Sequence, residues 1–448
     1  MKFSKFGQKF TQPTGISQLM DDLGDALKSD QPINMLGGGN PAKIDAVNEL
    51  FLETYKALGV DNDTGEANSS AIISMANYSN PQGDAAFIDA LVSFFNRHYD
   101  WNLSAENIAL TNGSQNAFFY LFNLFGGAFI DEKSQDKESQ SIDKSILLPL
   151  TPEYIGYSDV HVEGQHFAAV LPHIDEVTHD GEEGFFKYRV DFEALENLPA
   201  LKEGRIGAIC CSRPTNPTGN VLTDEEMAHL SEIAKRYEIP LIIDNAYGMP
   251  FPNIIYSDAQ LSWDNNTILC FSLSKIGLPG MRTGIIVADA KVIEAVSAMN
   301  AVVNLAPTRF GAAIATPLVN DDRIKQLADN EIKPFYQQQA TLAVELLKKA
   351  LGDYPLMIHK PEGAIFLWLW FKDLPISTLE LYERLKEKGT LIVPSEYFFP
   401  GVDVSGYQHA HECIRMSIAA DEQTLTDGIK VIGEVVRELY DEANSQNY

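Results

Sequence analysis

The densest chemical signal in the sequence is Ser272-Leu-Ser274-Lys275-Ile-Gly-Leu-Pro-Gly-Met-Arg282, which directly follows a short apolar run. A lysine beside two hydroxyl groups, just past a buried strand, is poorly placed for a solvated surface charge. Burial disfavours the ammonium form, and a neutral amine can form an imine with an aldehyde. Ser272, Ser274 and Arg282 would offer donors and positive charge to a phosphate nearby. An ordinary strand-to-loop cluster is the alternative.

A second stretch, Leu241-Ile-Ile-Asp244-Asn-Ala-Tyr247-Gly248, ends an apolar strand with a carboxylate. Ligand carboxylates often lie at the carboxyl edge of an α/β sheet. Asp244 would keep a pyridine nitrogen protonated through a charged hydrogen bond, as an electron-sink cofactor requires. A carboxylate that caps a helix after the strand is the other interpretation.

Two more polar motifs follow apolar strands. In Ser212-Arg-Pro-Thr-Asn216-Pro-Thr-Gly219-Asn220, two prolines and a glycine predict a rigid turn that could hold the Asn216 amide against a ligand. In Thr111-Asn-Gly113-Ser114-Gln115, the amides at the start of an apolar helix would face an anion. A proline-rich turn and a simple serine cap explain these motifs without a ligand.

Short apolar runs alternate with amphipathic helical stretches, which indicates an α/β sheet protein. Residues 83–98 place apolar side chains on one helical stripe, and Thr223-Asp-Glu-Glu226 has the pattern of a capping box. The expected strands are Ile108–Thr111, Ile146–Leu150, Ile206–Cys211, Leu241–Asp244, Thr267–Ser272 and Gly284–Ala288.

After about residue 320 the pattern changes to that of a smaller α+β domain. A long helix over 323–351 precedes two strands and a terminal helix; the strands are expected over Ala364–Phe371 and Ile414–Ile418. We therefore expect an N-terminal arm and part of the small domain in 1–48, a large domain in 49–320 and a small C-terminal domain in 321–448. The polar segments Gly59–Ser70 and Asp131–Lys144 predict surface loops.

Composition excludes several classes of protein. With 34 Lys and Arg against 62 Asp and Glu, the net charge of −28 disfavours nucleic acid and anionic membrane surfaces as partners. No signal peptide is expected at the N-terminus. The apolar run Gly363–Phe371 is far shorter than the ~20 residues of a spanning helix. The cysteines match neither a zinc site nor a disulfide framework, so we expect no metal and a cytoplasmic location; they are Cys210, Cys211, Cys270 and Cys413.

In this order, the four motifs resemble the aspartate-aminotransferase superfamily, fold type I of the pyridoxal-phosphate enzymes, over nearly the whole chain. Within this superfamily, the sequence resembles the valine–pyruvate aminotransferases in particular. It rests on the stretches 36–41 (LGGGNP), 113–125 (GSQNAFFYLFNLF), 152–157 (PEYIGY), 213–220 (RPTNPTGN) and 361–371 (PEGAIFLWLWF). It implies a mostly parallel seven-stranded sheet between helices in the large domain, a smaller α+β domain and bound pyridoxal 5'-phosphate.

The resemblance also implies roles for individual residues. Lys275 would form the imine, Asp244 would bind the pyridine nitrogen, and Tyr247 and Asn216 would bind the phenolic oxygen. Tyr154 would stack on the ring. The phosphate would be held by Ser272, Ser274, Arg282 and the backbone of Gly113, Ser114 and Gln115. Tyr78 would reach the phosphate of a neighbouring subunit, which implies a homodimer with shared active sites. Ordinary half-buried tyrosines are the alternative for Tyr154 and Tyr78.

Arg415 has support from its own neighbourhood. In Ile414-Arg-Met-Ser-Ile418 the apolar residues alternate, so Arg415 is expected on the opposite face of the strand from them. An arginine inside an apolar segment needs an anionic partner. The resemblance implies a substrate α-carboxylate there, and a structural salt bridge is the alternative. Gly38 and Gly39 would let the backbone approach that substrate closely. Their turn lacks the spacing of a dinucleotide-binding fingerprint.

These features together predict an aminotransferase with ping-pong kinetics. No cation occurs in residues 295–303, where dicarboxylate-specific relatives place a second arginine. This favours valine or alanine as amino donor and pyruvate or 2-oxoisovalerate as oxo acid, although Arg309 lies just beyond. A β-lyase or decarboxylase would use the same cofactor residues. A non-enzymatic regulatory protein that binds the cofactor is a third reading, disfavoured because no basic helix-turn-helix segment is present.

Overall fold

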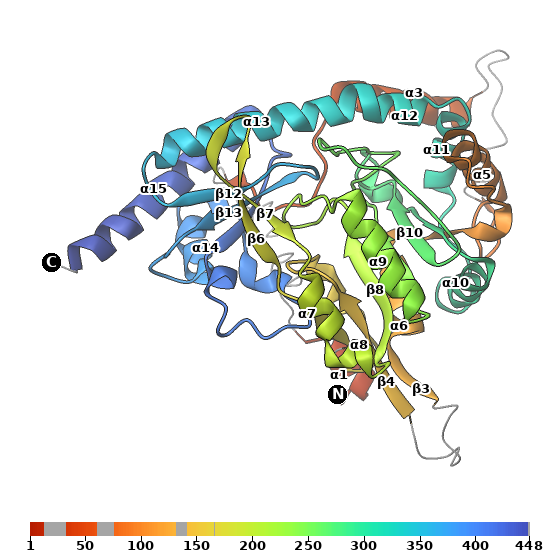
Figure 1. The fold of residues 1–448 in the computed structure, drawn as a ribbon. Helices are drawn as coiled ribbons and strands as arrows, with labels where there is room; N and C mark the ends of the chain where they lie inside the picture. Colours follow the sequence, from red (N-terminus) through yellow and green to blue (C-terminus); the bar gives the residue numbers. More distant parts are fainter. Residues whose placement is uncertain (13–32, 61–75, 131–140, 165, 447–448) are drawn as a thin grey trace.

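The computed structural model describes residues 1–12, 33–60, 76–130, 141–164 and 166–446. These residues form two large sheets with helices packed around them, and a long helix spans both (Figure 1). None of the helices in these ranges is long and apolar enough to cross a membrane.

The larger sheet has the strand order β2-β11-β10-β9-β8-β4-β3, with β5 paired to β4. Six strands run in one direction, and only β11 and β3 run against them. The strands are β2 (Ile108–Thr111), β3 (Gly127–Ile130), β4 (Ser141–Leu148), β5 (Phe167–Ala169), β8 (Ile206–Ser212), β9 (Leu241–Asp244), β10 (Thr267–Ser272) and β11 (Gly284–Val287). The predicted fold class is confirmed. The sheet has one strand more than the seven expected, because β3 pairs with the first half of β4.

Each central strand buries both faces, so its residues alternate between two apolar clusters. Ala109 and Ile242 belong to one cluster, while Leu110 and Ile243 belong to the other. The first cluster includes side chains of α6 (Ser114–Phe125) and α10 (Ala290–Val303). The second includes side chains of α5 (Ala85–Tyr99), α9 (Asp224–Arg236) and α11 (Phe310–Asn320). The predicted capping box of Thr223 and Glu226 opens α9.

The second sheet has the order β15-β16-β13-β12-β7-β6. Its strands are β6 (His173–His179), β7 (Glu182–Arg189), β12 (Leu356–His359), β13 (Phe366–Phe371), β15 (Val393–Pro394) and β16 (Cys413–Ser417). The β6–β7 hairpin comes from the middle of the chain and pairs with β12 in parallel. The domain boundaries given above remain a prediction.

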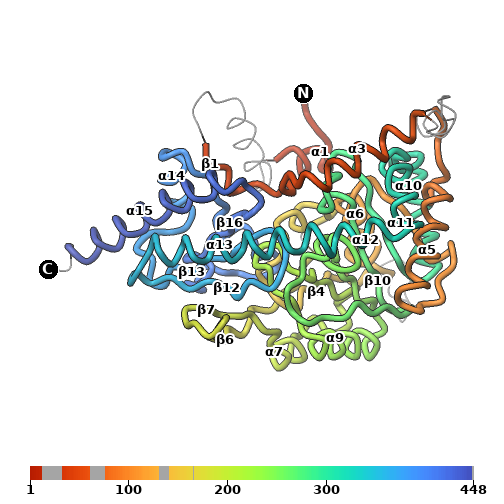
Figure 2. Tube along the Cα trace, turned by 90° about the horizontal axis from the view of Figure 1, so that it is seen from above, coloured from red at the N-terminus to blue at the C-terminus, as the bar shows by residue number. Residues whose placement is uncertain are grey.

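A long helical segment connects the two sheets, as Figures 1 and 2 show. It consists of α12 (Arg323–Leu327), a π-helical turn (Ala328–Ile332) and α13 (Lys333–Leu351), in agreement with the helix expected over 323–351. β1 (Asn34–Met35) pairs with β14 (Thr390–Leu391). The other helices are α1 (Lys5–Phe10), α3 (Asp45–Gly59), α7 (Phe192–Asn197), α8 (Pro199–Lys202), α14 (Thr378–Glu387) and α15 (Glu422–Gln446).

Several expected boundaries change. The strands expected to end at Leu150, Cys211 and Ala288 end at Leu148, Ser212 and Val287, and the strand expected over Ile414–Ile418 is Cys413–Ser417. The loop predicted over Asp131–Lys144 is wrong for 141–144, which begin β4, while 131–140 lie outside the described residues. Of the loop predicted over Gly59–Ser70, Gly59 ends α3 and 61–70 lie outside the described residues. The strand expected from Ala364 begins at Phe366, because Ala364 has φ +60°, a left-handed conformation that a strand does not allow.

Candidate active site

A cavity of about 510 Å³ lies at the carboxyl edge of the larger sheet. The parallel strands β8, β9 and β10 end there with Ser212, Asp244 and Ser272, all of which line the cavity. This is where ligands bind in open α/β sheets. The predicted site residues that line it are Gly38, Gly39, Ser114, Gln115, Tyr154, Asn216, Asp244, Tyr247, Ser272, Ser274, Lys275, Arg282 and Arg415.

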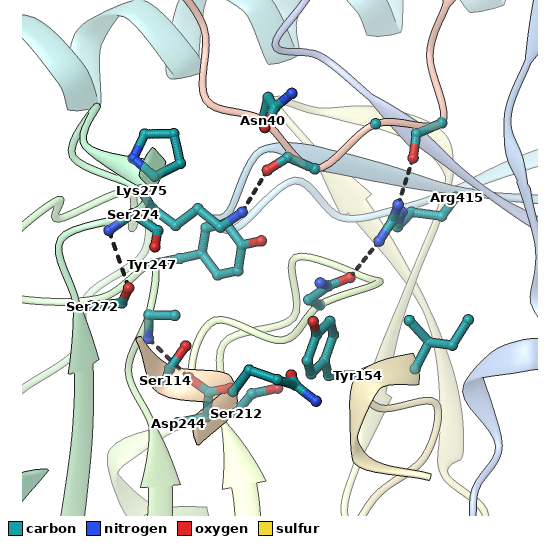
Figure 3. A pocket seen from close by; sticks show the side chains of 18 of the residues that line it. Asn40, Ser114, Tyr154, Ser212, Asp244, Tyr247, Ser272, Ser274, Lys275 and Arg415 are labelled. Atoms are coloured by element: carbon teal, nitrogen blue, oxygen red, sulfur yellow. Dashed lines mark hydrogen bonds between the residues drawn. The ribbon is translucent and has the colours of Figure 1, made fainter. Parts of the chain in front are cut away.

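Lys275 enters this cavity three residues beyond the end of β10 (Figure 3). Its Nζ donates to the carbonyl oxygen of Gly39 and lies 5.3 Å from the centre of the Tyr247 ring. Burial, reinforced by the positive charge of Arg415, lowers the pKa of Lys275 to about 8, and Asp244 opposes this shift. About a tenth of the amine is therefore neutral at pH 7, far more than for an ordinary lysine, and the neutral form is the one that a nucleophile requires.

Asp244 is buried and receives two hydrogen bonds. The hydroxyl of Tyr157 donates to Oδ2 at 2.8 Å, and the backbone amide of Ala246 donates to Oδ1 at 3.1 Å. Burial raises the pKa of Asp244 to about 6, while both hydrogen bonds and Lys275 act in the opposite direction. A carboxylate fixed in this way can accept a hydrogen bond from a protonated ring nitrogen.

A second buried carboxyl group, Glu153, lies behind the cavity. It accepts from the amide of Ser212 at 2.8 Å, from the Ser212 hydroxyl at 2.6 Å and from the amide of Tyr154 at 3.1 Å. Burial raises the pKa of Glu153 to about 8, with the hydrogen bonds from Ser212 opposing. Glu153 thus connects Tyr154 to the end of β8.

The phosphate-binding residues predicted from sequence gather at the start of α6. Arg282 lies close to the backbone of Gly113, since a Cβ on that glycine would stand 2.4 Å from its Nη2. The amide of Ser274 donates to the Ser272 hydroxyl at 3.0 Å. The first amides of a helix have no partner within the helix, so they and the guanidinium are donors that could hold an anion.

Arg415 is buried on β16 at the other side of the cavity. Its Nη1 donates to the Asn216 side-chain oxygen at 2.9 Å, and its Nη2 donates to the carbonyl of Gly37 at 2.7 Å. Its Nε is buried without a partner, and Phe366 lies beneath the guanidinium at 4.1 Å. Among the described residues no carboxylate pairs with it, which argues against a structural salt bridge. Burial lowers the pKa of Arg415 to about 10, and a buried cation of this kind calls for an anionic ligand.

Three sequence candidates lie outside the cavity lining. Gly113 stands behind Arg282, and Tyr78 is 82% exposed on the surface of the chain. Arg309, which complicated the substrate prediction, donates from Nε and Nη2 to one oxygen of Asp84 at 2.9 and 2.6 Å. Its guanidinium is thus engaged at the start of α5.

The sequence did not indicate every residue at the site. Tyr157 and Glu153 flank Tyr154 in the motif already noted at 152–157, yet nothing in that motif shows which strand ends they contact. The lining residues not predicted are Met35, Gly37, Asn40, Ile155, Ser212, Ala246 and Pro279. Gly37 and Asn40 adjoin the predicted glycines within the stretch 36–41 that carries the resemblance, and this signal could have found them.

The side chains fit a phosphorylated pyridine aldehyde. An amine at Lys275, a carboxylate at Asp244 and a guanidinium beside a helix start at Arg282 match an aldehyde, a ring nitrogen and a phosphate respectively. Tyr154 lines the same cavity with a flat ring. In the part of the chain that the structure describes, no three metal-ligating side chains cluster.

Comparisons with known proteins agree with this geometry. A family model described as "Aminotransferase class I and II" matches residues 178–432. The valine–pyruvate aminotransferase of Escherichia coli K12 is 44% identical over 99% of this chain and 100% of its own length. A crystal structure of the valine–pyruvate aminotransferase of Salmonella typhimurium LT2 superposes with a TM-score of 0.82 at 44% identity, covering 95% of this chain and 100% of that one. A crystal structure of a Psychrobacter arcticum 273-4 protein superposes with a TM-score of 0.95 at 93% identity, covering 98% of this chain and 99% of that one.

Proposed function

Because the chain belongs to the class I and II aminotransferases, a family of pyridoxal-phosphate enzymes, we propose that it exchanges the amino group of valine or alanine with pyruvate or 2-oxoisovalerate. The observation that carries this proposal is one cavity lined by Lys275, Asp244, Arg282 and Arg415. The cavity thus offers a nucleophilic amine and two separate cations for two separate anions.

Most of these groups would bind the cofactor. Lys275 would carry it covalently, and Asp244 would hydrogen-bond to its ring nitrogen. Tyr154 would stack on the ring, while Tyr247 and Asn216 would bind the phenolic oxygen. The phosphate would be held by Ser272, Ser274, Arg282 and the backbone of Gly113, Ser114 and Gln115. When bound, pyridoxal phosphate supplies an electron sink for the electrons of the substrate Cα–H bond.

Lys275 also moves the proton. Once its amine is free, Nζ acts as a general base and accepts the proton from the substrate Cα. It then acts as a general acid and donates the proton again later in the reaction. Its lowered pKa of about 8 suits both directions near neutral pH. Asp244, held by Tyr157, would keep the ring nitrogen protonated throughout. Two half-reactions of this kind give ping-pong kinetics.

The cations available at the cavity favour a substrate without a second carboxylate. Arg415 binds the α-carboxylate, and Gly38 and Gly39 leave room for the substrate beside it. Arg282 serves the phosphate. No further arginine lines the cavity in the described ranges, and Arg309 is engaged by Asp84. The apolar Met35 and Ile155 line the remaining wall.

The surroundings of the site support a homodimer in the cytoplasm. Tyr78 is exposed and so is available to the phosphate site of a partner subunit. Apolar side chains near it are exposed as well, including Val302 at 85% and Leu305 at 62%. All four cysteines are buried and unpaired, which suits a reducing compartment.

The proposal is tested by a product assay with the purified holoenzyme. We expect valine with pyruvate to give 2-oxoisovalerate and alanine in equal amounts, at a higher kcat/KM than aspartate with 2-oxoglutarate. A preference for aspartate would refute the proposed substrate. Release of ammonia or carbon dioxide without a new amino acid would indicate lyase or decarboxylase chemistry instead.

A further inference from the structure

A buried ion pair lies outside the cavity and is not used by the reaction. Lys187 on β7 and Glu362, just before β13, are each only 4% exposed, and the Nζ of Lys187 donates to Oε2 of Glu362. Burying two charges costs desolvation free energy that their attraction often fails to recover. A buried ion pair is therefore weak evidence of a contribution to folding stability. The other contacts of Lys187 and Glu362 indicate a different role.

Those contacts are with two consecutive residues of one loop. Lys187 Nζ also donates to the Asn220 side-chain oxygen at 3.1 Å and to the carbonyl of Val221 at 3.0 Å. The amide of Val221 donates to Oε2 of Glu362 at 3.1 Å. The pair thus anchors the end of the 213–221 loop to the second sheet through three hydrogen bonds.

Hydrogen bonds within the loop connect this anchored end to the residues nearer the cavity. The amide of Thr215 donates to the carbonyl of Asn220 at 2.8 Å, and the amide of Gly219 donates to the carbonyl of Thr215 at 2.8 Å. Gly219, at φ +72°, lies so close to the backbone of Gly363 that a Cβ would stand 2.6 Å from its carbonyl oxygen. A loop closed by its own hydrogen bonds and packed in this way moves as a unit.

The residue at the other end of this unit is Asn216. Its side-chain oxygen accepts from Arg415 Nη1 at 2.9 Å and so helps to fix the guanidinium. We propose that Lys187 and Glu362 are positioning residues: through Asn220 and Val221 they hold Asn216 where it orients Arg415 for a substrate carboxylate. This inference rests on the proposed role of Arg415.

Among the described residues, the other charged groups near Lys187 and Glu362 do not replace the contacts of this pair with the loop. Lys360 Nζ lies 3.8 Å from the other oxygen of Glu362, and its side chain is 36% exposed. Arg189 and Glu226 lie near Lys187 and act on its charge in opposite directions. Among the described contacts, only Lys187 joins Glu362 to the Asn220 side chain.

The experiment measures carboxylate binding by the holoenzyme with propionate, which lacks an amino group and reports on Arg415 through the cofactor's visible absorbance. Lys187→Met removes the two hydrogen bonds to the loop and is expected to weaken propionate binding by roughly tenfold. With valine, KM should rise more than kcat falls. Asn220→Ala keeps the charges of Lys187 and Glu362 and removes only the hydrogen bond between Lys187 and the Asn220 side chain. It should therefore weaken propionate binding by about threefold.

Lys348→Met is the matched control. It removes the ion pair with Glu182 on the same hairpin, where the side chains of Lys348 and Glu182 are 32% and 65% exposed. Lys348→Met should leave propionate binding unchanged. The thermal unfolding temperature is measured for all variants. If Lys187→Met does not fold, Asn220→Ala decides.

The inference is overturned if the folded variants bind propionate as the parent does, even where their unfolding temperature falls. A parent protein that acquires no covalently bound cofactor, or whose absorbance ignores propionate, would instead remove the proposed function itself. The two failures are therefore distinguishable.

Discussion

At the scale of single residues, the charge environment of Lys275 is the feature that most affects reactivity. Burial and the nearby arginines lower the pKa of its amine from an ordinary value of 10.5 to about 8. Only Asp244 favours the charged form. Below the pKa the ammonium ion predominates, and it cannot attack an aldehyde, so each pH unit lost reduces the reactive fraction about tenfold.

This gives a pH dependence for loading of the apoenzyme. The initial rate of covalent attachment of pyridoxal phosphate should rise with pH, bend near pH 8 and remain level above it. Nα-acetyllysine is the control, since its rate should keep rising toward its ordinary pKa. Stopped-flow absorbance measures both. A protein rate that climbs in parallel with that of Nα-acetyllysine would show that the amine is not perturbed.

Candidate site residues could be proposed from sequence where a side chain is conspicuous in its own neighbourhood. Asp244 ends an apolar strand, Lys275 lies three residues after one, and Arg415 interrupts one, so each is visible without the fold. Their proposed roles remain to be tested, but the structure brings all three to one cavity. Tyr157 could not be assigned, because its contact with Asp244 joins residues 87 positions apart. Glu153 is 59 positions from Ser212, and its importance also exists only in the folded chain.

At the scale of elements, the start of α6 is shaped by a glycine. Gly113 has φ +87° and precedes Ser114 at the first turn of the helix. Any side chain at that position would occupy the place of the Arg282 guanidinium, because an added Cβ would lie 2.4 Å from Nη2 and 2.9 Å from Cζ.

Gly113→Ala should therefore weaken cofactor binding by displacing Arg282. We expect the dissociation constant for pyridoxal phosphate to rise by roughly tenfold or more, about 1.4 kcal/mol. Gly204→Ala is the matched control: Gly204 has φ +70°, yet a Cβ there meets nothing within 4 Å. Gly204→Ala likewise places alanine at a positive φ, which costs about 1 kcal/mol or more, but without the clash. Equal cofactor affinity in the two variants would contradict the account.

The elements were predictable to different extents for a physical reason. β2, β9 and β10 begin and end at the expected residues, because each is a short apolar run bounded by polar groups. The β6–β7 hairpin was not among the expected strands. Its sequence carries consecutive charges at Asp175-Glu176 and Glu182-Glu183, which break the apolar–polar alternation of a half-buried strand. Its place is set by parallel pairing of β7 with β12, far away in the chain. Pairing between distant segments leaves little local signal.

At the scale of the whole molecule, several apolar side chains around the segment of Tyr78 are exposed in the single chain. Tyr78, Val302 and Leu305 are 82%, 85% and 62% exposed. Ser79 donates to the carbonyl of Pro307 at 3.3 Å, which ties the segment of Tyr78 to that following α10. An exposed apolar surface next to a tyrosine with a proposed role in another subunit is what a shared-site dimer requires.

Val302→Glu combined with Leu305→Glu should therefore produce monomers. Cofactor affinity should fall by about tenfold as well, because Tyr78 of the partner would be lost from the phosphate site. Ile130→Glu is the control, since Ile130 is 83% exposed at the end of β3. Sedimentation velocity measures the mass, and titration with pyridoxal phosphate measures the affinity. A double variant that stays dimeric, or a parent that is monomeric, would contradict this arrangement.

The central claim concerns the atom that carries the cofactor. Borohydride reduction of the holoenzyme, followed by peptide mass spectrometry, should find the pyridoxyl group on the peptide that contains Lys275 and on no other. Lys275→Ala should show neither the label nor the visible absorbance, and it should not transaminate valine. A label on a different lysine, or a Lys275→Ala protein that keeps both absorbance and turnover, would contradict the account.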